Sequence, residues 1–307
     1  MKLYQQFLCI KERSKLLMVG FVVATAGLLT ACADDATLEV TKADAQASSQ
    51  TSINQVESKQ TYVLAGYQLP SAIGADQAEQ EALLKALNEK EGSKQGLTQE
   101  EAKQQLLLRL TLFSSDKDQT LAKLEAITQG LTRASEFSAE QGEQDYELMA
   151  AMGSALSYQS IFYQADLGQM NLLSRKGMRY MDRAVKKAPN HLGVRLLRGL
   201  SYANMPVFLN RASFAVEDLS LLKNVLLQAS ESSAELHKKQ TLKKQDKKFI
   251  EFIDYYLALS FYKNAQLDVA RSLWQELENG SAANSSTSNA TSESQWSALA
   301  RQRLEEF

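Results

Sequence analysis

The scarcity of residues that form tight turns is the feature that most constrains the fold of this chain. Only 3 prolines and 14 glycines occur among its 307 residues. A β-sandwich or β-barrel of this length needs many tight turns, and proline and glycine are among the residues that make them. Alanine, leucine, glutamine, glutamate and lysine are abundant instead, and these residues favour helix. We therefore expect an all-α fold.

The first 31 residues have the pattern of a secretory signal. Four positive charges occur within residues 1–15, and a wholly apolar or small run then extends from Leu16 to Leu29. This run of 14 residues is shorter than the about 20 residues that a helix needs to cross a bilayer. A positive start, a short apolar core and small residues before a cleavage site are typical of a segment that is removed during export.

The end of this segment, Leu29-Thr30-Ala31-Cys32, resembles the lipobox of bacterial lipoproteins. The resemblance implies that Cys32 accepts a diacylglyceryl group on its sulfur, becomes the first mature residue and is then acylated on its new amine. Because Ala33 rather than aspartate follows the cysteine, the sorting pattern of enterobacterial lipoproteins favours the outer membrane, on its periplasmic side. The alternative is an ordinary signal peptide or a single membrane anchor, with Cys32 incidental.

Composition and charge argue against several classes of site. Cys9 lies in the segment to be removed and Cys32 would carry lipid, so the mature chain keeps no free thiol for a disulfide or a metal. His191 and His237 are the only histidines, and neither has a second ligand at metal-binding spacing. Acids outnumber bases, 36 to 34, so a basic nucleic-acid face is not expected. Because no phosphate loop or nucleophile elbow occurs, we expect no enzyme and no cofactor.

Changes in composition divide the mature chain into segments. Residues 33–60 contain no aromatic residue and few apolar ones, which is typical of a flexible tether. Further along, Thr98 and Glu101 have the spacing of a capping box at the start of a helix. The expected order is a tether over 32–60, helical hairpins over 61–140, helical repeats over 141–278, a low-complexity loop over 279–293 and a capping helix over 294–307.

The segment from Tyr255 to Leu277 resembles a tetratricopeptide repeat (TPR). Residues of the size that this family requires occupy the characteristic positions: Leu257, Ala258, Phe261, Ala265, Ala270, Trp274 and Leu277. Two weaker copies precede it, with small residues at Gly153 and Gly199. These glycines and Ala258 are spaced 46 and 59 residues apart, against 34 in a regular array. The resemblance implies a right-handed α-solenoid with a concave face, and a helical bundle with the same apolar spacing is the alternative.

In the repeat family the first helix of each hairpin lines the concave face. This resemblance places two sets of residues in a groove that would bind a partner: Tyr255, Leu259, Tyr262 and Lys263 from the last copy, and Leu196, Leu200, Ala203 and Asn204 from the preceding one. Tyrosines beside apolar residues suit the capture of a peptide or a helix, since aromatic anchors dominate such interfaces. The tyrosines could equally pack against the neighbouring hairpin.

Basic residues allow two interpretations. Arg195 and Arg198 lie about one helical turn apart and therefore share a face, and Arg211 follows them after a short insertion. They could form a cationic spot that receives a carboxylate, or they could pair with Glu217 or Asp218 and fix a hairpin. The lysine-rich segment 238–248 is either a solvated surface or a contact for an anionic partner.

The sequence therefore favours a lipid-anchored periplasmic adaptor that holds a protein partner in the concave face of helical repeats. The first alternative is a small-ligand binder that resembles the periplasmic accessory component of TRAP-type transporters, which encloses an apolar channel in a helical fold. Insertions at 157–176 and 204–211 would close a pocket in that case and leave an open groove in the other. The second alternative is a spacer without a specific partner.

Overall fold

The structure is a computed structural model that describes residues 67, 68, 70, 71, 77–236, 244–285 and 294–306. All of them fall in the second of the two units into which the chain divides, Tyr62–Phe307. The signal segment 1–31, the lipidation site Cys32 and the tether 32–60 lie outside the described residues, as does most of the lysine-rich segment 238–248. These expectations stay predictions.

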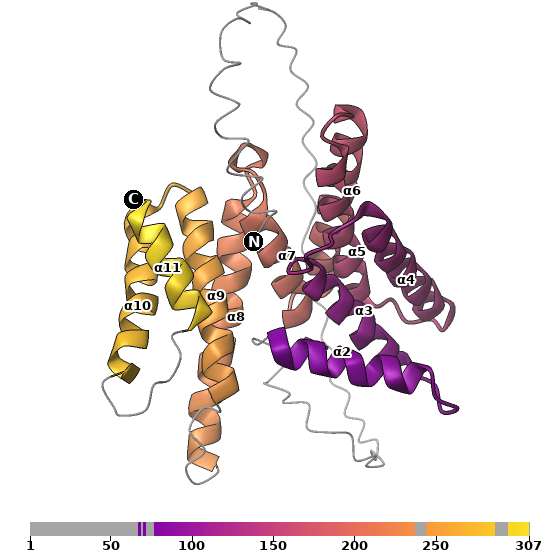
Figure 1. The fold of residues 1–307 in the computed structure, drawn as a ribbon, viewed down its shortest axis with the longest axis horizontal. Helices are drawn as coiled ribbons and strands as arrows, with labels where there is room; N and C mark the ends of the chain where they lie inside the picture. Colours follow the sequence, from indigo (N-terminus) through magenta and orange to yellow (C-terminus); the bar gives the residue numbers. More distant parts are fainter. Residues whose placement is uncertain (1–66, 69, 72–76, 237–243, 286–293, 307) are drawn as a thin grey trace, which may run out of the picture. The chain divides into compact units, whose positions relative to one another are not determined.

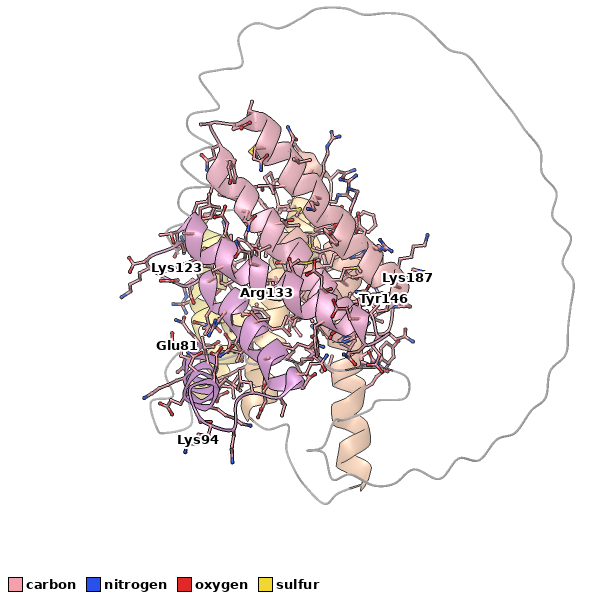
Figure 2. The ribbon with its side chains drawn as sticks, turned by 90° about the vertical axis from the view of Figure 1, so that its right-hand side faces the viewer. Glu81, Lys94, Lys123, Arg133, Tyr146 and Lys187 are labelled. Atoms are coloured by element: carbon pink, nitrogen blue, oxygen red, sulfur yellow. The ribbon has the colours of Figure 1, made fainter. Side chains whose placement is uncertain are left out.

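The described part of the chain is helical, which confirms the expected all-α class. Its α-helices are α2 (Gln77–Glu91), α3 (Gln99–Phe113), α4 (Leu121–Glu140), α5 (Tyr146–Gln159), α6 (Leu167–Lys187), α7 (Leu192–Asn204), α8 (Ala212–Leu236), α9 (Lys244–Lys263), α10 (Leu267–Ser285) and α11 (Gln295–Glu305). Two short 3₁₀-helices, η2 (Ser160–Tyr163) and η3 (Val207–Leu209), join them. Charged side chains such as Lys94 and Lys123 project away from the ribbon into solvent (Figure 2).

The predicted capping box begins α3. The Thr98 hydroxyl accepts a hydrogen bond from the Glu101 amide at 3.3 Å, and the Glu101 carboxylate accepts one from the Thr98 amide at 3.0 Å. Lys90 also donates to this carboxylate, and together with the Thr98 amide it lowers the pKa of Glu101 to about 2. The box therefore satisfies two amides that the first turn of a helix leaves without partners.

Successive helices pair into hairpins, α3 with α4, α5 with α6, α7 with α8 and α9 with α10, and each hairpin packs on the next (Figure 1). The more extensive contacts between α-helices that do not follow one another in the chain join the first helices of the hairpins, and join the last of these to α11. In the described ranges these are α3 with α5, α5 with α7, α7 with α9, and α9 with α11. The first helices thus lie next to each other, and the apolar core runs between them and their partners.

Small residues allow close approach within the hairpins, as the sequence predicts. A Cβ atom added to Gly153 of α5 would lie 2.6 Å from the carbonyl oxygen of Gly177 in α6, closer than real Cβ contacts allow. In the last hairpin, Ala258 of α9 and Ala270 of α10 have no exposed surface. Trp274 is also buried, among the residues that join α9, α10 and α11.

The insertions lengthen the ends of hairpins. Residues 157–176 form the end of α5, the 3₁₀-helix η2 and the beginning of α6, which reaches 21 residues. Residues 204–211 contain η3 and a left-handed Asn210 with a φ of 53°. At the other end of the chain, α10 continues to Ser285 and so extends into the 279–293 segment expected as a loop. The alanines at 282 and 283 favour this continuation, since alanine is the strongest helix former.

The close approach of α5 and α6 predicts that alanine substitution changes the free energy of unfolding in opposite directions at two helical glycines. Alanine at Gly153 should lower the free energy of unfolding by about 1–3 kcal/mol, because the new methyl group collides with backbone atoms of α6. Alanine at Gly280 of α10, where a Cβ meets nothing within 4 Å, should raise it by about 0.5–1 kcal/mol through helix propensity. Urea denaturation followed by circular dichroism measures both, and a shift of the same sign at both sites would contradict the packing.

Candidate interaction groove

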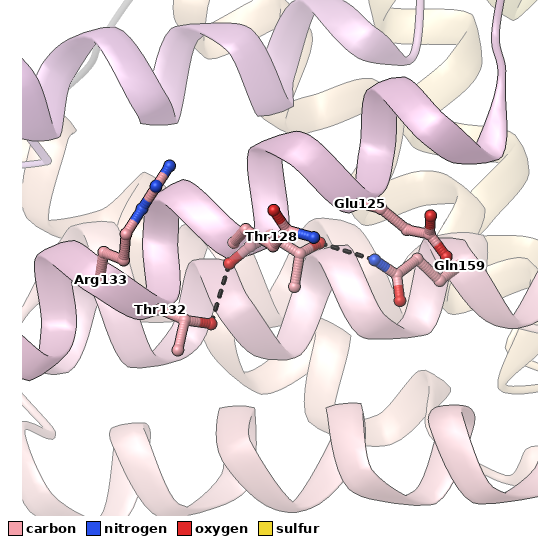
Figure 3. Close-up of a pocket in the computed structure, with 6 residues that line it drawn as sticks. Glu125, Thr128, Thr132, Arg133 and Gln159 are labelled. Atoms are coloured by element: carbon pink, nitrogen blue, oxygen red, sulfur yellow. Dashed lines mark hydrogen bonds between the residues drawn. The ribbon is translucent and has the colours of Figure 1, made fainter.

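One hollow, of about 450 Å³, lies where α4 meets α5, and Figure 3 shows its lining. Gln159 donates to the Thr128 hydroxyl at 2.8 Å, and the Thr132 hydroxyl donates to the Thr128 carbonyl oxygen at 2.9 Å. Glu125, Gln129 and Arg133 follow one another at intervals of four residues, so they lie along one side of α4. The lining is thus a solvated helix face whose central groups already bond one another, and we assign no ligand to it.

A second hollow, here called the inner cavity, has a volume of about 160 Å³. Its helical lining residues come from α2, α3, α5, α7, α9 and α11, and α4, α6, α8 and α10 contribute none. The cavity is therefore walled by the first helices of the hairpins, with α2 and α11 at its ends. Neither insertion, 157–176 or 204–211, contributes to its lining.

Aromatic rings form one wall of the inner cavity. The Phe252 ring centroid lies 5.1 Å from that of Tyr256 and 5.1 Å from that of Trp296, both in edge-on geometry. Phe249 stacks on Phe252 at 5.8 Å. Phe252, Tyr256 and Trp296 are each half-buried, so part of every ring remains open. Partly exposed aromatic rings that lock one another in place are the usual anchors of a protein interface.

One of the residues that line the inner cavity is charged and buried. Glu147 of α5 lines it and is 1% exposed. Lys103 of α3 lies 3.0 Å from this carboxylate and 2.8 Å from that of Asp145, which also caps α5. Burial alone would lower the pKa of Lys103, but Glu147 and Asp145 outweigh it and raise the pKa. The three groups form a buried ion-pair cluster whose carboxylate reaches the cavity.

His191 precedes α7 beside this cluster. Its Nε2 atom lies 3.9 Å from Glu147, and it caps the helix without a side-chain hydrogen bond. Burial lowers the pKa of His191, and the charge of Glu147 opposes that shift. The ring of His191 is therefore half-buried against an acid at the N-cap position of α7.

The groove residues predicted from the repeat divide into two groups. Leu196 and Leu200 of α7 do line the inner cavity. Tyr255 and Leu259 do not, because both are buried, at 5% and 2% exposure, where α9 packs against α10 and α11. Tyr255 thus adopts the packed alternative that the sequence left open, and Leu259 is buried with it, because the terminal helix covers the face that the repeat pattern would leave open.

The remaining predicted groove residues lie at the ends of α7 and α9. Lys263 donates from Nζ to the carbonyl oxygens of Ala203 at 2.7 Å and Met205 at 2.8 Å, so it caps the end of α7. Burial lowers the pKa of Lys263 to about 8. Asn204 bonds the backbone carbonyl four residues earlier, and Tyr262 is 40% exposed beside Lys263. None of these residues lines the inner cavity.

The residues of α9 that do line it are Phe249, Phe252 and Tyr256. They are spaced by three and four residues, so they occupy one helix face. Tyr256 and the predicted Tyr255 are neighbours, and one residue corresponds to a rotation of about 100° around the helix. The signal for this face in the sequence is the spacing of apolar residues from Phe249 onward. It indicates a face of α9 that is adjacent to the face selected by the repeat pattern.

The first two arginines of the predicted cationic spot are paired with acids. Arg198 binds Asp218 through two hydrogen bonds, of 2.6 and 2.9 Å, and Asp218 has no exposed surface. Arg195 bonds Asp218 at 2.8 Å and the exposed Glu217 at 3.0 Å. The interpretation as ion pairs that fix the α7–α8 hairpin is therefore confirmed, and the carboxylate-receiving spot is wrong for both residues.

Arg211 joins the same cluster from the other side. Its guanidinium lies 3.4 Å from Asp182 of α6, which also binds Arg198 at 3.3 Å. Arg211 also lies over the rings of Tyr202 and Phe214, each at 5.6 Å from the ring centroid. Its partner is thus Asp182, and the acids that the sequence offered, Glu217 and Asp218, pair with the other two arginines.

The α7–α8 ion pairs generate a test with two neighbouring acids. Alanine at Asp218 should lower the free energy of unfolding by about 3–5 kcal/mol, because Arg195 and Arg198 lose a fully buried partner. Alanine at Glu217, which is exposed and binds Arg195 alone, should cost less than about 0.5 kcal/mol. Thermal or urea denaturation measures the difference, and equal losses at the two sites would refute the assignment.

Comparisons with protein-family models, with curated proteins and with solved structures found no match for this chain.

None of the described helices is long and apolar enough to cross a membrane. Within the same residues, histidine, cysteine and acidic side chains form no group of three or more that could hold a metal ion. The candidate interaction groove is therefore defined by its geometry, as the inner cavity with its aromatic wall and the buried carboxylate of Glu147.

Proposed function

We propose that the protein is a lipid-anchored periplasmic adaptor that holds a segment of a protein partner in its inner cavity. The observation that carries this proposal is the cavity's lining, which combines half-buried aromatic rings with the leucines of α7. Such surfaces bind through a few apolar anchors. The proposal involves no covalent chemistry, no cofactor and no nucleic acid.

We also propose a TPR-like α-solenoid for the helical hairpins. The support is the contact pattern, in which the first helices contact one another in succession while the second helices contact their neighbours along the chain. That pattern is typical of stacked hairpins whose first helices form the concave face. The small residues at Gly153, Gly177, Ala258 and Ala270 support the same arrangement.

The proposed location rests on the N-terminal sequence. The lipobox-like Leu29-Thr30-Ala31-Cys32 would place a lipid anchor on Cys32, and the following Ala33 favours the outer membrane. The tether of 32–60 would then hold the helical domain away from the bilayer, over a distance of roughly 30 Å for a flexible chain of this length.

A small-ligand binder of the TRAP-accessory kind is the second candidate, and two observations favour the adaptor over it. The cavity volume of about 160 Å³ is below the roughly 300–1,000 Å³ of typical small-molecule sites. The two insertions, which would have to close a pocket, contribute nothing to its lining. A volume of this size suits one or two side chains of a protein partner.

The adaptor is tested by site-specific photo-crosslinking in cells. Thr111 of α3 is exposed and lines the inner cavity, whereas Gln129 of α4 is exposed and lines the hollow beside α5. A benzophenone side chain at 111 should crosslink one discrete envelope protein, because that position faces the proposed binding site. The same side chain at 129 should not, because it lies outside the cavity.

Tryptophan at Thr111 provides the matched competition test, since it fills the cavity without removing a core side chain. It should reduce the crosslink formed from Ser115, another cavity position, by at least about tenfold. Tryptophan at Gln129 should leave it unchanged. A crosslink from 129 that equals the one from 111, or none from either, would contradict the adaptor.

A further inference from the structure

A short stretch of the chain itself already lies along the edge of the inner cavity. We call residues 67, 68, 70 and 71 the leading segment. The Gln68 amide donates to the Asn190 carbonyl oxygen at 3.1 Å, and the Leu192 amide donates to the Gln68 carbonyl oxygen at 2.8 Å. Gln68 and His191 thus form a parallel β-bridge at the beginning of α7. This pairing uses backbone atoms alone, so it does not depend on the side chain at position 68.

The side-chain specificity of this contact comes from Glu147. Its carboxylate accepts a hydrogen bond from the Ser71 amide at 3.0 Å and another from the Ser71 hydroxyl at 2.6 Å. The acid is 1% exposed, and Lys103 binds the same carboxylate oxygen that accepts the Ser71 hydroxyl. A buried, fixed carboxylate that receives both an amide and a hydroxyl is a receptor for a serine or threonine residue.

The backbone of α7 leaves space for the leading segment. A Cβ atom added to Gly193 would lie 3.0 Å from the Pro70 Cα atom and would collide with the Glu147 carboxylate. Pro70 is buried and forms part of the cavity wall, and Tyr67 packs on the core between α7, α8 and α9. The residues that receive the leading segment, 190–193 and Glu147, are here called its seat. The seat adjoins the inner cavity, because Pro70, Glu147 and Gly193 also line that cavity.

We propose that the leading segment is an internal ligand, and that its seat is the place where an extended segment of the partner binds in competition with it. The partner segment carries a small apolar residue followed by serine or threonine, in the positions of Pro70 and Ser71. Its backbone pairs with residues 190–192, and its next apolar side chain enters the inner cavity. This inference rests on the proposed function and names the chemistry of the partner.

Charge excludes one modification of that partner. A phosphate on the bound hydroxyl would lie within hydrogen-bonding distance of the buried Glu147 carboxylate, and like charges that close repel. The seat therefore selects the unmodified hydroxyl.

The internal ligand also competes strongly, because residues 72–76 join it to α2 over five residues and a short linker gives an effective concentration in the millimolar range.

The test uses the mature chain from Cys32 and a fluorescent peptide with the sequence of residues 63–74, VLAGYQLPSAIG. Alanine at Ser71 of the protein weakens the internal ligand and leaves the seat intact, so it should increase peptide affinity at least about tenfold over wild type. Alanine at Ser93, whose hydroxyl bonds the Lys90 carbonyl, is the matched control and should bind as wild type does. Fluorescence anisotropy measures all three.

Two altered peptides test the receptor role of Glu147. Replacing the peptide's serine by alanine should reduce its affinity for the Ser71→Ala protein at least about tenfold, because the charged hydrogen bond is lost. Phosphorylating the same serine should reduce affinity by at least as much. Equal affinity for all three peptides would overturn the assignment.

Hydrogen exchange in the wild-type protein gives a second readout that needs no substitution. Saturating peptide should speed exchange at the Gln68 and Ser71 amides, because their acceptors are taken by the peptide. The Leu192 amide should stay protected, since the peptide backbone replaces Gln68 as its acceptor. Peptide binding without any change at Gln68 and Ser71 would overturn the proposal, and this measurement decides it even where the Ser71→Ala variant does not fold.

Failure here is distinguishable from failure of the adaptor. If the peptide does not bind but the crosslink from position 111 persists, the internal-ligand inference falls and the adaptor stands. If the peptide displaces the leading segment but position 111 yields no crosslink, the seat binds peptides and the proposed adaptor falls.

Discussion

The close approach of paired helices is the constraint on which the rest of the structure depends. Gly153 and Gly177 bring α5 against α6, and Gly199 leaves space for Leu219 and Asp218 of α8. Hairpins this tight stack with their first helices in succession. That succession creates a common wall, and the inner cavity lies along it. A larger side chain at the glycines would separate the helices and disturb the wall that carries the candidate site.

Two fully buried acids then fix α7, the helix at the centre of this wall. Asp218 holds Arg195 and Arg198 from the α8 side. Glu147 holds the beginning of α7 from the α5 side, because it binds Ser71 of the leading segment and Gln68 of that segment pairs with Asn190 and Leu192. Buried acids of this kind are costly unless every oxygen has a partner, and both carboxylates have theirs. The hydrogen bonds that satisfy the Glu147 carboxylate also fix it in a position where it can accept a bond from a hydroxyl group.

The sequence predicted the parts of this arrangement that depend on local pattern. Helix formers and the lack of turn residues predict the all-α class, and small residues predict the tight hairpins. Leu196 and Leu200, which the repeat pattern assigns to a partner groove, line the inner cavity. The face of α9 was missed because α11, which packs over Tyr255 and Leu259, is a tertiary partner. The contact of Ser71 with Glu147 spans 76 residues, and no periodicity in the sequence carries such information.

The central claim is that a lipid-anchored chain holds a protein segment in the inner cavity, and native mass spectrometry of the protein extracted from membranes with its lipid tests it most directly. The account predicts an acylated Cys32 and a stoichiometric protein adduct that is lost with tryptophan at Thr111. An adduct of small-molecule mass would contradict the account in favour of a ligand binder. A lipidated chain without any adduct would contradict it in favour of a spacer.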